Sequence, residues 1–157
     1  MKSPAELTEL FRNQGLKVTP QRQRIFSALY GNLEHPTAES VYASVINEMP
    51  TISLRTVYQT LNDLASMGEL VHLEFGNGSG RFDTNLDRHH HLVCDECSKV
   101  VDVDVDATAV RVPSSGRTGF TVTSTQIVFR GSCAECENPL PRTKALPTTK
   151  HEEQVNA

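Results

Sequence analysis

The sequence has no long hydrophobic run, no apolar segment at its N-terminus, no excess of positive charge and no cysteine outside two CxxC pairs. No run approaches the roughly 20 apolar residues that cross a bilayer, which argues against a membrane protein. The first residues, MKSPAELTEL, lack the apolar core of a secretory signal, so we expect a cytoplasmic protein with no membrane partner. In a reducing cytosol, CxxC pairs are more often metal or redox sites than disulfides.

The net charge of −4 argues against a nucleic-acid partner, but its distribution weakens that argument. Four basic residues and no acidic ones lie between Phe11 and Leu33, namely Arg12, Lys17, Arg22 and Arg24. Acidic residues are concentrated later, at Asp83, Asp87, Asp95, Glu96, Asp102, Asp104 and Asp106. In a chain of 157 residues, which can hold one sizeable domain or two small ones, this pattern predicts a DNA-binding domain followed by a metal-binding domain.

Apolar periodicity and capping residues predict four helices in the first part of the chain. A short amphipathic helix is expected over residues 4–14. Thr19, Thr37 and Ser53 are predicted N-caps of three further helices, the last of which ends at Gly68. Short strands are expected over 69–75 and 80–83, joined by a glycine-rich turn. Helices closed by a small hairpin describe a winged helix-turn-helix.

The pattern changes after about Asp87. Short strands are expected over 91–94, 100–105, 120–124 and 127–130. The stretch 106–119 can start as a helix, but Pro113 and the Ser and Gly residues after it would cut the helix short. The proline-rich tail over 138–157 is expected to be disordered. The predicted fold class is therefore α+β, with an N-terminal winged helix and a small C-terminal α/β domain.

The two CxxC turns, Cys94/Cys97 and Cys133/Cys136, can bring four thiolates together. Zinc prefers such a closed site of four soft ligands, and its role there is structural. The alternatives are two disulfides, a thioredoxin-like redox pair, or cysteines that oxidise reversibly and release zinc. A thioredoxin-type motif begins a helix within a βαβ unit, and nothing in this sequence resembles one.

A second candidate metal site consists of histidines and carboxylates. His89 and His91 alternate on an expected strand and therefore point to the same face, whereas His90 points away. Asp102 on the next strand can reach the same place, and Asp83 lies near the junction between the two parts. Such ligands suit Fe(II), Mn(II) or Zn(II). His35 lies in a turn before a helix, where a lone histidine is usually a surface or capping residue.

The helix that starts at Ser53 has a polar face opposite its apolar one. Arg55, Thr56, Gln59 and Asn62 lie on this polar face, with Tyr58 at its edge. Such side chains can contact base edges in the major groove, although most surface helices also have a solvated polar side. Lys17 and Arg22, near the start of the second helix, are predicted to contact phosphates.

Taken together, these residues resemble the ferric uptake regulator family. The matching segments run in order along the chain and are Val18–Arg22, His35–Ala38, Ser53–Tyr58, Arg81–Asp83, His89–Cys94, Cys97, and the Cys133/Cys136 pair. Within the family, the chain is most similar to the peroxide-sensing repressor branch. That branch has an aspartate where iron-sensing members tend to have a glutamate, and Asp83 matches it. Iron-sensing members often carry a further histidine before the second cysteine pair, which forms a third metal site; the segment 121–127 contains no histidine.

The resemblance implies a regulatory Fe(II) or Mn(II) bound by His35, Asp83, His89, His91 and Asp102, beside the structural zinc. It implies a homodimer that binds a palindromic operator and opens or closes at a hinge over 84–88, between a DNA-binding domain (1–83) and a dimerisation domain (89–137). With Fe(II) bound, peroxide is expected to oxidise His35 or His89 and so relieve repression. One departure is that residues 111–119 replace the second half of the family's dimerisation helix, so we expect a dimer interface that is smaller or differently built.

Three other functions compete with this one, and one of them is a thiol-redox switch or metal carrier that uses the four cysteines. Within the same class, the chain can be a plain iron, manganese or zinc uptake regulator that does not respond to peroxide. From another class comes a zinc hydrolase that uses His89, His91 and Asp83 around a metal-bound water. No glutamate or histidine stands out as its general base, so we predict that the protein is not an enzyme.

Overall fold

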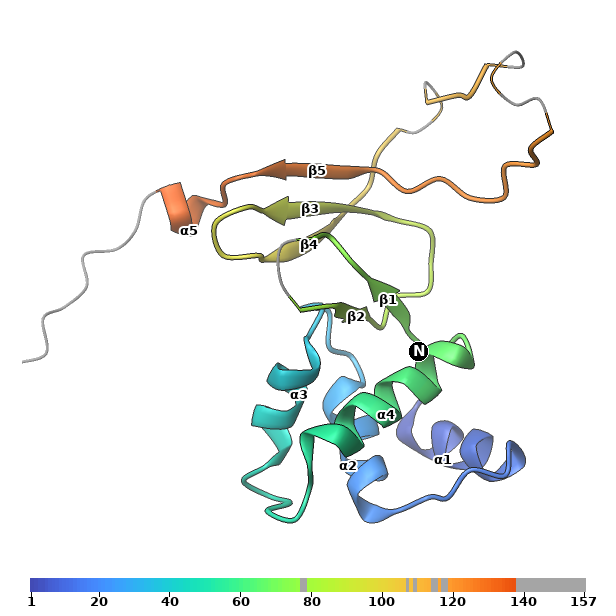
Figure 1. Cartoon of the computed structure of the whole chain (residues 1–157), viewed down its shortest axis with the longest axis vertical. Coiled ribbons are helices and arrows are strands. Elements are labelled where there is room, and N and C mark those ends of the chain that lie inside the picture. Colours follow the sequence, from blue (N-terminus) through green and yellow to red (C-terminus); the bar gives the residue numbers. More distant parts are fainter. Residues whose placement is uncertain (77–78, 107, 109, 114–115, 117–118, 138–157) are drawn as a thin grey trace, which may run out of the picture.

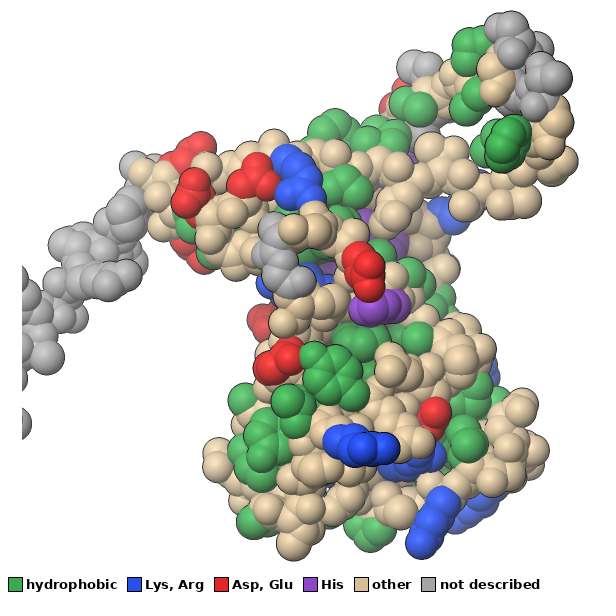
Figure 2. All heavy atoms as spheres, in the orientation of Figure 1, with side chains coloured by type: hydrophobic (Ala, Val, Ile, Leu, Met, Phe, Trp, Pro, Cys, Tyr) green, Lys and Arg blue, Asp and Glu red, His purple; other side chains and the backbone are tan. Residues whose placement is uncertain are grey.

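The computed structural model describes residues 1–76, 79–106, 108, 110–113, 116 and 119–137, so the predicted disordered tail lies outside the described residues. Four helices and a two-stranded hairpin form a lower part, and a three-stranded sheet forms an upper part (Figure 1). Figure 2 shows these parts as two lobes joined by a narrower waist. Among the described residues, no helix is both long and apolar enough to cross a membrane.

The helices of the lower part begin where the sequence places hydroxyl-bearing caps. They are α1 (Pro4–Asn13), α2 (Pro20–Leu29), α3 (Ala38–Val45) and α4 (Leu54–Ser66). The side chains of Thr19, Thr37 and Ser53 each accept a hydrogen bond from a backbone N–H of the first turn, as predicted. Ser3 and Glu6 form a reciprocal capping box at the start of α1. Such caps typically stabilise a helix by about 1 kcal/mol each.

One hydrophobic core holds the four helices together. Phe11, Phe26, Val57, Leu61 and Leu64 are all fully buried in it. Burying each such side chain contributes roughly 1.5–3 kcal/mol of transfer free energy. This core fixes the direction in which α4 presents its outer face.

The hairpin of the lower part consists of β1 (Val71–Leu73) and β2 (Arg81–Asp83), which pair antiparallel. Phe82 of β2 is buried in the helical core. The hairpin therefore belongs to the helical part, as expected for the wing of a winged helix.

The upper sheet contains β3 (His90–Cys94), β4 (Val100–Val103) and β5 (Val128–Gly131), in the order β4-β3-β5. β3 pairs antiparallel with β4, and this register sets His91 beside Asp102. β3 pairs parallel with β5. A short helix, α5 (Ala134–Glu137), follows β5 and was not expected from the sequence.

Two sequence expectations for the upper part differ from the structure. The strand expected over 120–124 is absent, since none of the strands in the described part of the chain pairs with this segment, and Phe120 is 80% exposed. Between residues 106 and 119, the described residues form no α-helix. The described residues between β4 and β5 instead lead away from the upper sheet (Figure 1).

Candidate metal centres and DNA-binding face

Four thiols meet at one end of the upper sheet. Cys94 ends β3, Cys97 lies in the turn before β4, Cys133 directly precedes α5, and Cys136 lies within α5. Their sulfur atoms all lie within 4.8 Å of one another, and all four cysteines are free thiols. The Sγ–Sγ distances are 3.8 Å for Cys94 and Cys136 and 3.7 Å for Cys97 and Cys133. A zinc ion with bonds of about 2.3 Å sets tetrahedral sulfurs about 3.8 Å apart, so this cluster fits Zn(II).

The thiols of this cluster differ in acidity because of their local contacts. The backbone N–H groups of Cys97 and Cys133 lower the pKa of the Cys94 thiol to about 6. The neighbouring sulfurs of Cys133 and Cys97 raise the pKa of Cys136 well above its usual range. Four sulfurs this close cannot all ionise without a cation between them. The chemistry of the donor set therefore favours a metal-filled site over a reactive thiol pair.

A second cluster lies at the waist, where the two parts of the molecule meet. It consists of three imidazoles and two carboxylates, each offering one ligand atom within 4.8 Å of the others: His35, Asp83, His89, His91 and Asp102. His35 precedes α3 and Asp83 ends β2, so both belong to the lower part. The other three lie just before β3, on β3 and on β4. The structure therefore brings together all five side chains that the family resemblance singled out.

The distances in this waist cluster suit a single first-row metal ion. Asp83 Oδ2 lies 2.8 Å from His89 Nε2, and Asp102 Oδ1 lies 2.7 Å from His35 Nε2. The Nε2 atoms of His89 and His91 are 3.0 Å apart. Ligand atoms about 2.1 Å from an ion lie roughly 3–4 Å from each other, and these separations are at or slightly below the lower end of that range.

Several ligand atoms of the waist cluster are buried without a hydrogen bond from any described residue. They are His35 Nε2, Asp83 Oδ2 and Asp102 Oδ1. His35 Nε2 approaches Asp102 Oδ1 to 2.7 Å but makes no hydrogen bond with it. Buried polar atoms in native proteins are nearly always satisfied. A cation in the middle of the cluster would satisfy all three atoms, so the residues present fit Fe(II) or Mn(II).

His35 reaches the cluster through an unusual backbone conformation. Its φ of 49° lies in the left-handed region, and the following Pro36 makes helical conformations still less favourable. The turn is held by β2, since Arg81 donates to the His35 carbonyl at 3.0 Å and the Phe82 N–H donates to the Pro36 carbonyl at 2.9 Å. His35 is only 1% exposed and is therefore not the surface or capping residue that a lone histidine usually is.

The waist cluster shifts the pKa values of its members in different directions. Burial lowers the pKa of His91, and repulsion from His89 and His35 adds to this effect. Burial alone would raise the pKa of Asp83, but contacts with His35, the Asn85 backbone and His89 outweigh it and hold the pKa below its usual range. A neutral imidazole and an ionised carboxylate are the forms that bind metal.

Three residues that sequence reasoning did not single out support these ligands. Asn85 donates from its side chain to Asp102 Oδ2 at 2.9 Å. Gln126 lies 3.3 Å from His91 Nδ1, and the Phe75 ring packs on His91 with centroids 5.6 Å apart. Such partners fix the orientation of metal ligands. Of the three, only Asn85 had a signal in the sequence: it follows Asp83 by two residues, and aspartate tends to accept a hydrogen bond from the backbone two residues later.

The outer face of α4 is open to a partner. Arg55, Gln59 and Asn62 are exposed, whereas Val57 and Leu61 on the opposite face are fully buried. The Thr56 hydroxyl contacts the cap residue Ser53, and the Tyr58 hydroxyl donates to Glu39 of α3 at 2.6 Å. Arg, Gln and Asn are side chains that can pair with base edges.

The two predicted phosphate contacts differ in their surroundings. Lys17 is exposed. Arg22 is largely covered by its neighbours. Its guanidinium pairs with Asp63 Oδ2 at 2.7 Å, and its Cζ lies 5.1 Å from the centroid of the Phe11 ring. The Arg22 side chain is only 12% exposed. In this structure the Arg22–Asp63 pair joins α2 to α4.

A winged helix with an open outer helix, joined at a five-ligand cluster to a sheet with a four-thiol cluster, defines a metal-dependent DNA-binding regulator. Comparison with known proteins identifies the family. The model of the ferric uptake regulator family matches residues 13–130, and the chain belongs to this family. It is therefore a transcriptional regulator and not an enzyme.

Individual relatives agree with this assignment. The chain is 34% identical over 128 residues to the peroxide-responsive repressor PerR of Staphylococcus aureus, an alignment that covers 81% of this chain and 86% of that protein. The ferric uptake regulator of Helicobacter pylori has the same fold, with a TM-score of 0.72, 22% identity and coverage of 88% and 98%. PerR of Streptococcus pyogenes, a peroxide sensor, gives a TM-score of 0.50 at 28% identity, with coverage of 87% and 94%.

Proposed function

We propose that the protein is a peroxide-responsive, metal-dependent repressor whose regulatory Fe(II) or Mn(II) is bound by the waist cluster. The observation that carries this proposal is that five ligand atoms from both parts of the molecule converge within 4.8 Å. Because His35 and Asp83 belong to the lower part and the other three ligands to the upper sheet, metal binding favours one arrangement of the two parts. The similarity to PerR of Staphylococcus aureus supports the assignment to peroxide sensing.

The switch acts through the population of a closed form. A ligand shifts a conformational equilibrium only by its difference in affinity for the two forms. An open form would separate His35 and Asp83 from the other ligands and lose most of the metal affinity. We infer a DNA-binding domain over 1–83, a hinge over 84–88 and a dimerisation domain over 89–137. Residues 86–88 are exposed, whereas Thr84 is buried and bonded to the Asn32 carbonyl at 2.7 Å.

The proposed response to peroxide alters a ligand. Fe(II) held by the waist cluster would supply the redox chemistry needed to cleave the O–O bond of peroxide, which Mn(II) would not. In the net reaction a histidine ring gains one oxygen atom and loses two electrons, and peroxide leaves as one water. His35 and His89 are the proposed targets, and of the two the His89 side chain is more accessible, at 10% exposed against 1%. An oxidised ring no longer offers the same lone pair, so the closed form is lost.

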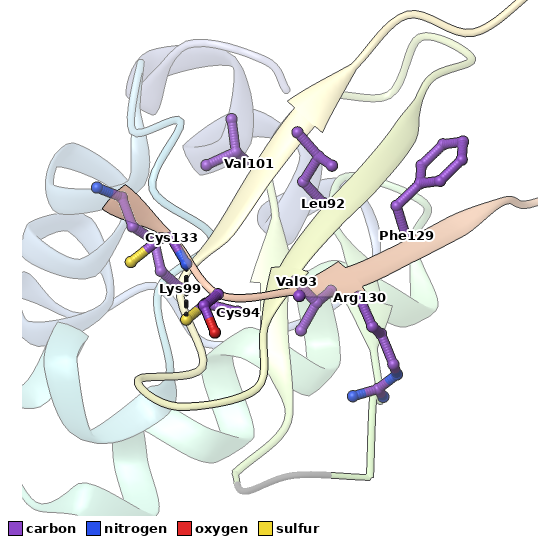
Figure 3. A pocket seen from close by; sticks show the side chains of 10 residues that line it. Leu92, Val93, Cys94, Lys99, Val101, Phe129, Arg130 and Cys133 are labelled. Atoms are coloured by element: carbon purple, nitrogen blue, oxygen red, sulfur yellow. Dashed lines mark hydrogen bonds between the residues drawn. The ribbon is translucent and has the colours of Figure 1, made fainter. Parts of the chain in front are cut away.

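We propose that the upper sheet also forms the homodimer. Leu92, Val101 and Phe129 project from one face of the sheet next to the four-thiol cluster (Figure 3) and are each 43–45% exposed. A second copy that covers this apolar face would bring two α4 helices into one assembly. Such a dimer suits a palindromic operator, with two half-sites about one helical turn apart. We place the protein in the cytoplasm, where its DNA is.

DNA binding with each metal, before and after peroxide, tests this function. The zinc-loaded full chain is given Fe(II) or Mn(II), and its affinity is measured on duplexes selected from a random library in the presence of Mn(II). We expect peroxide to abolish binding only with Fe(II) and to add the mass of one oxygen atom to the peptide of His35 or His89. If both metal forms keep their affinity and mass, the peroxide sensor is refuted, and an iron, manganese or zinc uptake regulator takes its place.

A further inference from the structure

Asn85 contacts both carboxylates of the waist cluster. Its backbone N–H donates to Asp83 Oδ1 at 2.7 Å, and its side-chain Nδ2 donates to Asp102 Oδ2 at 2.9 Å. Asp83 belongs to the lower part of the molecule and Asp102 to the upper sheet. A single residue therefore holds the two acidic ligands in place across the junction between the two parts.

The orientation of the Asn85 amide is fixed on its other side. Its Oδ1 accepts the backbone N–H of Asp87 at 3.1 Å, so the amide nitrogen is the atom that faces Asp102. The Asn85 side chain is half-buried, and its amide makes the contacts with Asp102 and with the Asp87 backbone at the same time. Hydrogen bonds to an ionised carboxylate are among the stronger ones in proteins.

These contacts determine which oxygen each carboxylate presents. Asp83 Oδ1 and Asp102 Oδ2 are occupied by Asn85, while Asp83 Oδ2 and Asp102 Oδ1 are buried, face the cluster and lack a hydrogen bond from any described residue. The arrangement offers the centre of the cluster one oxygen from each carboxylate. The second oxygen of each is prevented from turning inward.

We propose that Asn85 is a positioning residue of the regulatory site, which makes Asp83 and Asp102 single-oxygen ligands and ties the two parts of the molecule together there. This inference rests on the proposed function, since it concerns the metal bound by that cluster. It assigns to Asn85 control of the number of oxygen ligands. Without Asn85, the Asp102 carboxylate is free to rotate and to present both oxygens.

The variant Asn85→Ala removes the side-chain donor and leaves the backbone N–H in place. Loss of an outer partner of a metal ligand typically weakens metal binding 10- to 100-fold, and we expect a loss of about this size for Mn(II). Leu86→Ala is the matched control, because it truncates an exposed side chain in the same loop. His91→Ala serves as the reference for loss of the site itself.

The experiment titrates Mn(II) chloride into the zinc-loaded full chain by calorimetry and records the Mn(II) electron paramagnetic resonance spectrum of each bound form. We expect Asn85→Ala to bind more weakly than Leu86→Ala and to show a changed spectrum, which reports an altered ligand set. An affinity equal to that of the control, or a weaker affinity with an unchanged spectrum, overturns the role of Asn85. If wild type and His91→Ala bind Mn(II) equally, the proposed function itself fails, which is a distinct result.

Discussion

Replacing His91 by alanine should remove the stabilisation that Mn(II) gives to the fold. Free metal at 100 times its dissociation constant stabilises the native state by about 2.7 kcal/mol. For a chain of this size, each kcal/mol raises the melting temperature by roughly 2–4 °C, so Mn(II) should raise that of wild type by about 5–11 °C. His91 is 2% exposed and supplies one of the five ligand atoms of the cluster, so its removal leaves an incomplete ligand set around the ion.

The assay compares each zinc-loaded protein with and without Mn(II) by differential scanning calorimetry. His91→Ala also leaves a cavity, which lowers the melting temperature of the metal-free variant, but the metal-induced difference within one variant is independent of that loss. His90→Ala is the control, because His90 lies on the same strand and its Nδ1 accepts the Ile127 N–H outside the cluster. A full Mn(II) shift in His91→Ala, or an equal loss in His90→Ala, would refute the reasoning.

Three further predictions concern the parts around this cluster. Asp63→Ala should lower the free energy of unfolding by about 1–3 kcal/mol, measured in urea, because it leaves the nearly buried Arg22 unpaired. Cys97→Ser should lose stoichiometric zinc by elemental analysis and lose amide protection over 89–137, while the helices that share the lower core keep theirs. Burial lowers the pKa of His89, but the Asp87 carbonyl and the carboxylates of Asp83 and Asp102 outweigh burial, so the net shift raises the pKa. Protonated His89 cannot bind metal, so Mn(II) affinity should decline as pH falls, starting above the ordinary histidine pKa of about 6.5. Protonated His89 stabilises the metal-free fold below about pH 6.5, and this contribution is lost as pH rises through the raised pKa of the folded state. The rise in melting temperature caused by Mn(II) should therefore grow with pH. Calorimetry at several pH values measures this rise, and a rise that stays constant would contradict the prediction.

Local features of the lower part could be predicted from the sequence because their causes are local. Thr19, Thr37 and Ser53 cap their helices through contacts within one turn, and the predicted starts are confirmed. The strand expected over 120–124 was wrong, because a strand depends on a neighbour elsewhere in the chain. In the upper sheet, β4 and β5 already pair with the two edges of β3, so β3 offers no free edge to the segment 120–124.

The two metal centres differ in how much of each the residues alone could predict. The four-thiol cluster follows from two short motifs, because each CxxC turn places its own pair of sulfurs. His35 could be placed only by resemblance, since its burial depends on Arg81 and Phe82, which come much later in the chain and hold the turn against β2. The role of Asn85 depends on Asp102, and no sequence pattern joins these two positions.

The most direct test of the account is whether metal at the waist cluster controls DNA binding. Fluorescence anisotropy would measure the affinity of the zinc-loaded full chain for a selected duplex as Mn(II) is added, for wild type and for Asp83→Asn, which removes a ligand charge from the lower part. The account predicts that Mn(II) strengthens binding by wild type at least tenfold, a coupling of about 1.4 kcal/mol, and leaves the variant unchanged. Equal affinity with and without Mn(II) in wild type would contradict it.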